Sequence, residues 1–357
     1  MPMRVCTGGA ADEMMGRSLR RVPLRIRRRT RITVAVVVVI LLLLAVAVYL
    51  RKKAPPEAAR LLPESDGIVY LNLRPLRAVT HFDQRPVTHD PDYQNFIDAT
   101  GIQFERDLDE VAFAMHRMPN PSGPNGAVAF SEVFVGHFDG RRLAQYLEGI
   151  TSTREEYAGH TIYSIPSNGR TVRVTLLGYD VVAVSNTPTA EQIHSILDRY
   201  RSAALPFAGS SLLSDYYEDV PLLSLAWGIG QIGLPLGDSG DVRVMGLRLP
   251  INFDSKFIAS LRWTGSLRLR LEEIAPTEEA AASSAEAAKL VLGFARNAEI
   301  TVPGMTDADL KPLLNSIQIE HHKDRAVLHA TLPMPLLQRL VTPEKLQPPP
   351  APTSGSK

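Results

Sequence analysis

Hydrophobic residues are distributed very unevenly along this chain. A stretch of 19 residues, 32–50 (ITVAVVVVILLLLAVAVYL), carries no charge. At ~1.5 Å per residue a helix of this length measures ~28 Å, close to the ~30 Å hydrocarbon layer of a bilayer. A soluble core helix would need a polar stripe, and this stretch is apolar on all sides. The pattern therefore predicts a transmembrane helix over residues 32–50.

After a linker over residues 51–62, the hydrophobic pattern becomes that of a globular domain. Alternation of apolar and polar residues predicts strands at 67–73, 111–115, 127–137, 161–165, 171–177 and 180–185. Asp139 is a good N-cap for a helix, and a second helix is predicted to begin at Thr187-Pro188. The apolar faces of these helices are predicted to hold Leu143, Tyr146, Leu147 and Ile150 in the first and Ile193, Ile196, Leu197 and Tyr200 in the second.

The remainder of the chain shows a similar order of elements. A buried strand is predicted at 222–227, a hairpin at 257–264 and 266–274 about Gly265, a helix at 276–299 and a closing hairpin at 316–322 and 325–332. Strands outnumber helices without regular βαβ alternation, which predicts an α+β fold with an antiparallel or mixed sheet and helices packed on one side. Residues 63–205 and 206–341 form two α+β halves, and duplication of one from the other stays an open alternative.

The charges of the two ends of the chain are opposite. Residues 1–53 hold 12 Lys and Arg against 2 Asp and Glu, a net of +10, and the rest holds 27 against 36, a net of −9. The basic side of the apolar stretch is expected to remain in the cytoplasm, so the domain after it is exported. The leader 1–31 is expected to be disordered, as is the Pro-rich tail 342–357. The arginines expected to contact lipid headgroups are Arg25, Arg27, Arg28, Arg29 and Arg31.

Two alternatives to this topology are open. Ala45-Val46-Ala47 has the form of a signal-peptidase site, but the apolar run is longer than a usual signal-peptide core and a basic triplet follows at once. The uncharged run 220–237 just reaches the minimum length of a second transmembrane helix. Its glycines and prolines instead favour a strand followed by an apolar loop. Within that loop, the candidate contacts to a partner or the bilayer are Ile229, Ile232, Leu234 and Leu236.

Motifs for chemistry are few. Residues 228–233 spell G-x-G-x-x-G, but Pro235 and Gly237 follow where a dinucleotide site needs a helix, so a glycine-rich loop is favoured. The single cysteine, Cys6, excludes a disulfide within the chain. His322 and His329 are expected to point outward from the last hairpin about 13 Å apart, too far to share a metal ion. The sequence predicts no cofactor and no metal site, and the leader lacks the aromatic residues that favour nucleic-acid binding.

Two acidic groupings are the only support for an enzyme. Asp107, Asp109 and Glu110 form one, and Asp215, Glu218 and Asp219 form the other. Either could serve acid and base catalysis, but an acidic domain is expected to carry such groups as solvated surface. A hydrolase would need two of them to converge with a histidine in a concave site.

Four segments carry a resemblance to a known group of proteins. They are LLPESDGIVYLNLRPLR, VFVGHFDGRRLAQYLEG, YAGHTIYSIP and VVAVSNTPTAEQIHSILDRYR. They resemble uncharacterised bacterial single-pass membrane proteins, in which a G-x-F-D segment joins a strand to a helix and an exported α+β domain follows the anchor. The resemblance covers most of residues 60–340 and implies no activity, catalytic residue or cofactor.

The sequence therefore favours a binding or structural protein over an enzyme. We expect a single-pass protein of an inner or plasma membrane, held in the bilayer by residues 32–50 and carrying an exported periplasmic domain. Its expected partner is a protein of the cell envelope, and nucleic acid is not expected to bind. An exported hydrolase that uses carboxylates of the domain is the alternative.

Overall fold

The computed structural model describes residues 36–42, 44, 54–84, 89–202, 209–231, 243–244, 247–248, 254–297 and 307–332. The chain divides into two compact units, residues 1–51 and 52–357. The predicted leader 1–31 and tail 342–357 lie outside the described residues, as does the A-x-A segment 45–47. The five arginines assigned to lipid headgroups also lie there.

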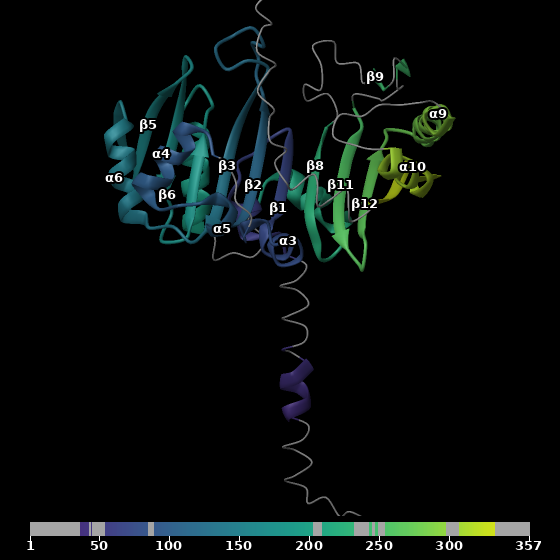
Figure 1. Cartoon of the computed structure of the whole chain (residues 1–357), viewed down its shortest axis with the longest axis horizontal. Helices are drawn as coiled ribbons and strands as arrows, with labels where there is room; N and C mark the ends of the chain where they lie inside the picture. Colours follow the sequence, from purple (N-terminus) through teal and green to yellow (C-terminus); the bar gives the residue numbers. More distant parts are fainter. Residues whose placement is uncertain are drawn as a thin grey trace, which may run out of the picture. The chain divides into compact units, whose positions relative to one another are not determined.

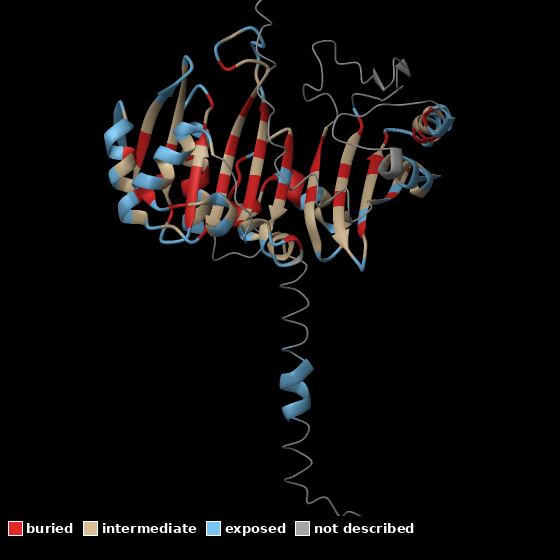
Figure 2. Cartoon of the chain, viewed as in Figure 1, coloured by how far each residue is buried: buried red, intermediate tan, exposed pale blue. Residues whose placement is uncertain are grey.

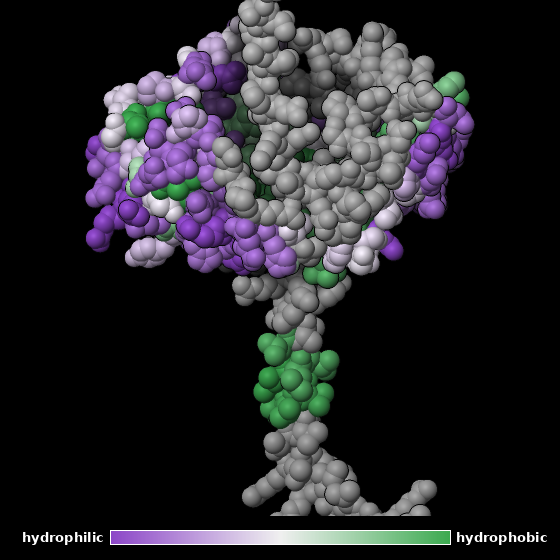
Figure 3. Space-filling model, in the orientation of Figure 1, coloured by the Kyte–Doolittle hydropathy of each residue, from purple (hydrophilic) through white to green (hydrophobic). Residues whose placement is uncertain are grey.

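The first unit is described only within the predicted membrane segment. Residues 36–42 and 44 are helical, and their apolar side chains are about half exposed. Because these residues are hydrophobic, they form a green group of atoms in Figure 3. Among the described residues, no helix has both the length and the apolar character needed to cross a membrane. Most of the predicted span 32–50 lies outside those residues.

The second unit is built on one large antiparallel sheet (Figure 1). In the described part of the chain it holds twelve strands, in the order β13-β14-β12-β11-β8-β1-β2-β3-β7-β6-β5-β4. The strands are β1 (Gly67–Asn72), β2 (Leu108–Arg117), β3 (Val128–Gly136), β4 (Thr153–Tyr157), β5 (His160–Ser167), β6 (Arg170–Leu176), β7 (Val181–Ser185), β8 (Ser224–Gln231), β11 (Lys256–Trp263), β12 (Leu267–Ile274), β13 (Gln318–His322) and β14 (Arg325–Leu332). A separate short pair is formed by β9 (Arg243–Val244) and β10 (Leu247–Arg248).

The two halves of the sheet have the same strand order about a shared centre. In the first half β1, β2 and β3 form a meander, and β7 returns beside β3. In the second half β8, β11 and β12 form a meander, and β14 returns beside β12. The first strands of the halves, β1 and β8, pair antiparallel and join them into one sheet. Internal duplication, predicted from the order of elements, stays a prediction at the level of sequence.

Helices connect and cover the strands. They are α2 (Glu57–Leu61), α3 (Leu73–Thr80), α4 (Pro91–Thr100), α5 (Phe104–Asp107), α6 (Gly140–Ile150), α7 (Glu191–Ser202), α8 (Ser211–Tyr216), α9 (Glu278–Asn297) and α10 (Asp307–Ser316), with 3-10 turns at Phe82–Gln84 and Tyr217–Asp219. α9 and α10 pack against β13 and β14 at one end of the sheet, and α4 and α6 pack together at the other end (Figure 1).

The helices pack on both faces of the sheet, so the prediction of helices on one side is wrong. Successive residues of a strand point to opposite faces, and on β5 Ile162 and Tyr163 belong to different clusters of buried side chains. The Ile162 cluster includes residues of α2, α7 and α8 and extends across β1, β8 and β11. The Tyr163 cluster includes Leu143 and Leu147 of α6 and lies at the β4 end.

Several local predictions are confirmed by specific contacts. The Asp139 side chain accepts hydrogen bonds from the backbone N–H groups of Arg141 and Arg142, and so caps α6. Gly265 turns the β11–β12 hairpin with a φ of 81°, a conformation that favours glycine. The last hairpin turns at residues 323–324 as predicted. Ile150 is the exception on α6, because its side chain is 42% exposed rather than packed.

Other elements differ from their predicted bounds. α7 begins at Glu191 rather than at the Thr187-Pro188 pair. The edge strand β4, the helix α3 and the helix α10 were not predicted. β4 has the sequence TREEY, in which polar residues do not alternate with apolar ones, so the sequence gives no strand signal. These residues suit the edge of a sheet, because charged side chains there hinder pairing with the strands of other chains.

Candidate functional site: an apolar sheet face without a helix

One row of residues crosses eight neighbouring strands of the sheet on the face that carries α6. Directly opposite residues in antiparallel strands share a face, and the row joins Val184, Glu132, Phe113, Val69, Gly228, Ala259, Leu271 and Leu328. The neighbouring rows contain further large apolar side chains, among them Leu71, Met115, Phe130, Phe257, Leu261, Trp263 and Leu269. We call the part of these rows on β1, β2, β3, β8, β11 and β12 the central apolar face.

Part of the central apolar face keeps access to solvent, whereas Val111 and Leu267 on the same face are 4% and 1% exposed. Val69 is 38% exposed, and Phe113, Phe257 and Trp263 are partly exposed, as shown by the tan bands on the central strands in Figure 2. None of these four residues belongs to either cluster of buried side chains. The opposite face of the same strands is filled by Ile68, Tyr70, Trp227 and others under α2 and α8. On β1, β2 and β8 both faces therefore carry apolar residues, and the described helices fill one of these faces, whereas the second face of β12 holds Arg268, Arg270 and Glu272.

Glu132 is the unusual residue of this face. It lies on β3 between Phe113 of β2 and Val184 of β7. Burial raises the pKa of its carboxyl group. Among the described residues, no hydrogen bond or ion pair reaches it. An acid in such surroundings is held toward its neutral form, because desolvation penalises the charge and no described group compensates for it.

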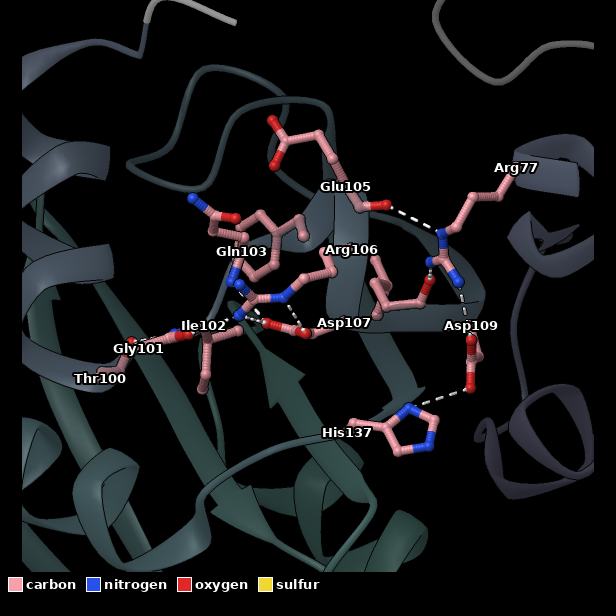
Figure 4. Close-up of polar contacts among 12 residues, drawn as sticks. Arg77, Thr100, Gly101, Ile102, Gln103, Glu105, Arg106, Asp107, Asp109 and His137 are labelled. Carbon is pink, nitrogen blue, oxygen red and sulfur yellow. Dashed lines mark hydrogen bonds and ion pairs between the residues drawn. The ribbon is translucent and has the colours of Figure 1, made fainter. Parts of the chain in front are cut away.

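A second cluster, of polar residues, lies at the start of β2 (Figure 4). The pairing of β2 with β3 shifts register between Leu108 and Glu110, and Asp109 lies at this shift. Such an irregularity changes the direction of the side chain. Its carboxylate lies 3.2 Å from Arg77 Nη1, 2.9 Å from Arg74 Nη2 and 3.4 Å from His137 Nδ1. Arg77 also donates to the backbone carbonyls of Glu105 and Leu108.

The carboxylates of this polar cluster are held as anions. Burial alone would raise the pKa of Asp109, but hydrogen bonds from Arg74 and Arg77 outweigh burial and keep the pKa below its usual range. The pKa of Asp107 is lowered in the same way, because Arg106 and the Gln103 N–H oppose the effect of burial. Glu110 instead bonds Tyr70, and burial raises its pKa. Paired anions of this kind stabilise a strand end, and a proton donor or nucleophile would need a freer group.

One member of the other acidic grouping, Asp219, forms an ion pair. Asp219 lies 3.1 Å from Arg325 Nη2, and Arg325 Nη1 lies 2.7 Å from Glu272, which is 1% exposed. His322 and His329 share a face and are exposed, but His322 is opposite Arg325 and His329 is opposite Gln318. Within the described ranges, no three His, Cys, Asp or Glu residues are grouped so as to hold a metal ion.

The predicted contact residues are only partly described. Ile229 is 2% exposed and belongs to the core under α2 and α8, so it is not a surface contact. Ile232, Leu234 and Leu236 lie outside the described residues. Gly228 and Gly230 belong to strand β8 rather than to a loop. A Cβ atom at Gly230 would lie 2.8 Å from Gly67 Cα, which accounts for glycine at this position by strand pairing.

The central apolar face itself was missed by the sequence analysis. Its signal is present in the strand segment VAFAM, where residues on both faces are apolar, and in FIASLRW, where every second residue is apolar. Continuous apolar runs indicate a strand with both faces covered. Which residues of different strands share this face depends on the register of pairings between distant segments, which no single strand contains.

Comparisons with known proteins add little to this geometry. No family model matches the chain, and no curated protein matches it. Among solved structures, crystal form III of TP0453 aligns with a TM-score of 0.42 and 12% identity, over 80% of this chain and 97% of that chain. Crystal form IV aligns with a TM-score of 0.41 and 11% identity, over 81% and 97%. Similarity at this level carries no inference about fold or function.

Proposed function

We propose that this protein is a non-catalytic, single-pass membrane protein whose exported domain binds an apolar partner on the central apolar face. The observation that carries the proposal is the set of partly exposed aromatic and aliphatic side chains across six adjacent strands. Burying one such side chain fully contributes about 1.5–3 kcal/mol, so a partner that covered several of them would gain substantial binding energy. Large apolar surfaces left accessible are typical of interaction sites.

The membrane anchor is supported by the sequence. The uncharged stretch 32–50 has the length of a span, and its more basic flank precedes it. An alkaline phosphatase fused after residue 357 is expected to be active, because this enzyme folds only outside the cytoplasm. An inactive fusion that is nevertheless expressed would contradict the exported domain.

The hydrolase alternative has no supporting observation among the described residues. In these groupings Glu110 bonds Tyr70, Asp219 is paired with Arg325, and Asp107 and Asp109 are paired with arginines and have lowered pKa values. A general acid requires the reverse shift. We therefore do not propose an activity for these groups.

A photo-crosslinking residue placed on the central apolar face tests the binding proposal. The full chain would carry the crosslinker at Val69, which is 38% exposed on this face, or at Tyr179, which is 93% exposed in a loop. We expect adducts in intact cells from position 69 and few from position 179. A large increase in mass would identify a protein partner, and a small one would identify a lipid. Equal yields at the two positions would contradict the proposal.

A further inference from the structure

Three other carboxylates that are buried or half-buried in this domain have described partners within the chain. Glu272 is paired with Arg325 and Arg270, and Glu273 accepts a hydrogen bond of 2.7 Å from Ser255. Glu110 bonds Tyr70. Glu132 differs, since no described group reaches its carboxyl although burial disfavours its charge. Holding a half-buried carboxylate without a partner destabilises the fold, and a ligand that pairs with the carboxylate would remove that cost.

The surroundings of Glu132 define the chemistry of that ligand. Its carboxyl group accepts hydrogen bonds when ionised and is best matched by a cation. Every other residue of the row from Phe113 to Leu271 is apolar or glycine. A ligand that fits both features has an apolar chain with a cationic group at one end. The net charge of −9 after residue 53 disfavours a ligand that is anionic overall.

The dimensions of the face suit one acyl chain. Four strand spacings separate β3 from β11, and at ~4.8 Å each they span ~19 Å. A leaflet of the bilayer holds chains that extend ~15 Å, half of the ~30 Å hydrocarbon layer. Gly228 and Ala259 lie in the row beyond Val69, so small side chains form the floor along which such a chain would lie.

We infer that the central apolar face binds an ethanolamine phospholipid of the membrane, with the ammonium group at Glu132 and an acyl chain lying across β2, β1 and β8. This inference rests on the proposed function and names its ligand. The ammonium donates up to three hydrogen bonds to the Glu132 carboxylate, and the chain covers Phe113 and Val69. Lipids with the same chains but without the ammonium bind more weakly.

Tryptophan fluorescence offers a direct test, because the chain has two tryptophans on opposite faces. Trp227 is 3% exposed in the core, and Trp263 lies on the central apolar face. A reporter protein would combine Trp263→Phe with Phe257→Trp, which places one tryptophan near the proposed chain. Trp263→Phe alone keeps only Trp227 and serves as the control. The full chain is reconstituted into phosphatidylglycerol vesicles that contain a lipid with brominated acyl chains, which quench tryptophan on contact.

Brominated phosphatidylethanolamine is expected to quench the reporter at about tenfold lower content than brominated diacylglycerol, as one charge-assisted hydrogen bond predicts. Glu132→Gln should remove that difference, and it should not unfold the domain, since it replaces an acid that has no described partner by an amide of similar shape. Glu279→Gln, at an exposed acid in the first turn of α9, makes the same charge change away from the face and should have no effect.

The outcomes separate the inference from the proposed function. If both lipids quench the reporter equally in the parent and in Glu132→Gln, recognition of the ammonium by Glu132 is overturned and apolar binding stands. If neither lipid quenches it, the phospholipid ligand is overturned. The proposed function then stands only if the crosslinker at Val69 yields a protein adduct.

Discussion

Gly230 of β8 lies directly opposite Gly67 of β1, at the pair of strands that joins the two halves of the sheet. The backbones approach so closely that a Cβ atom on Gly230 would lie 2.8 Å from Gly67 Cα and 2.9 Å from the Asp66 carbonyl oxygen. Real Cβ atoms do not occupy such positions, so the central pairing depends on glycine here.

Replacing Gly230 should therefore weaken the joint between the halves. We expect Gly230→Ala to lower the free energy of unfolding by about 1–3 kcal/mol, as overpacking of a tight site does, measured by urea denaturation. Gly228→Ala is the matched control, because its Cβ would meet the nearest atoms at 3.5 and 3.6 Å, an ordinary contact. Equal losses for the two variants would show that close approach is not the reason for Gly230.

The polar cluster at the start of β2 should contribute to stability. Asp109→Ala removes the acceptor of Arg74 and Arg77 from a site where the side chain is 4% exposed. Losing hydrogen bonds to a charged group at a buried position is expected to cost about 1.5–3 kcal/mol of unfolding free energy. Glu286→Ala removes an exposed pair with Lys289 and should leave the unfolding midpoint unchanged. A midpoint for Asp109→Ala equal to that of the parent would contradict this account.

The stability of the domain should depend on pH through His116. This residue is 6% exposed, and its Nε2 lies 2.9 Å from Ser131 Oγ in a chain of hydroxyls that continues to Ser185 and Thr187. Burial lowers its pKa from the usual 6.5, and Asp66 offsets only part of that shift. The unfolded chain therefore binds the proton more readily than the folded one.

This difference in proton binding gives stability that is present above pH 6.5 and is lost as pH falls through the folded pKa of His116. The free energy of unfolding should drop between about pH 7 and pH 5, by at most about 1.4 kcal/mol per pH unit from this one group. His116→Gln, which can keep a hydrogen bond to Ser131, should have the shallower pH profile. Parallel profiles for parent and variant would exclude His116 as the cause.

Arg325 should be important to the second half of the sheet. It bridges Glu272, which is 1% exposed, and Asp219, and these pairs raise its pKa. Arg325→Met leaves Glu272 with Arg270 as its remaining described cationic partner and should cost about 3 kcal/mol of unfolding free energy. The double variant Arg325→Met with Glu272→Gln should recover part of that loss, because the buried charge is gone. No recovery would indicate that Arg325 acts through packing alone.

Local sequence patterns identified many helices, strands and turns of this fold but not the elements and side chains that pack against them. Asp139 marked the start of α6, and Gly265 marked a hairpin turn, because capping and positive φ depend on neighbours in the chain. The G-x-G segment at Gly228 was predicted as a loop, whereas it is a central strand. Its glycines reflect the approach of β1, a strand more than 150 residues earlier in the chain. Acidic groupings were visible in sequence, but their arginine partners were not.

By itself, the sequence determined the opposite charges of the two ends, the apolar stretch 32–50 and much of the succession of strands and helices in an α+β domain. These depend on composition and on periods of two or 3.6 residues, which are local properties. Only the tertiary structure decided that helices cover both faces of the sheet and that Ile229 is buried. It also placed Glu132 between Phe113 and Val184 in a row of otherwise apolar residues and glycine. Those facts depend on the register between distant strands, where a shift by one residue would move every side chain to the opposite face.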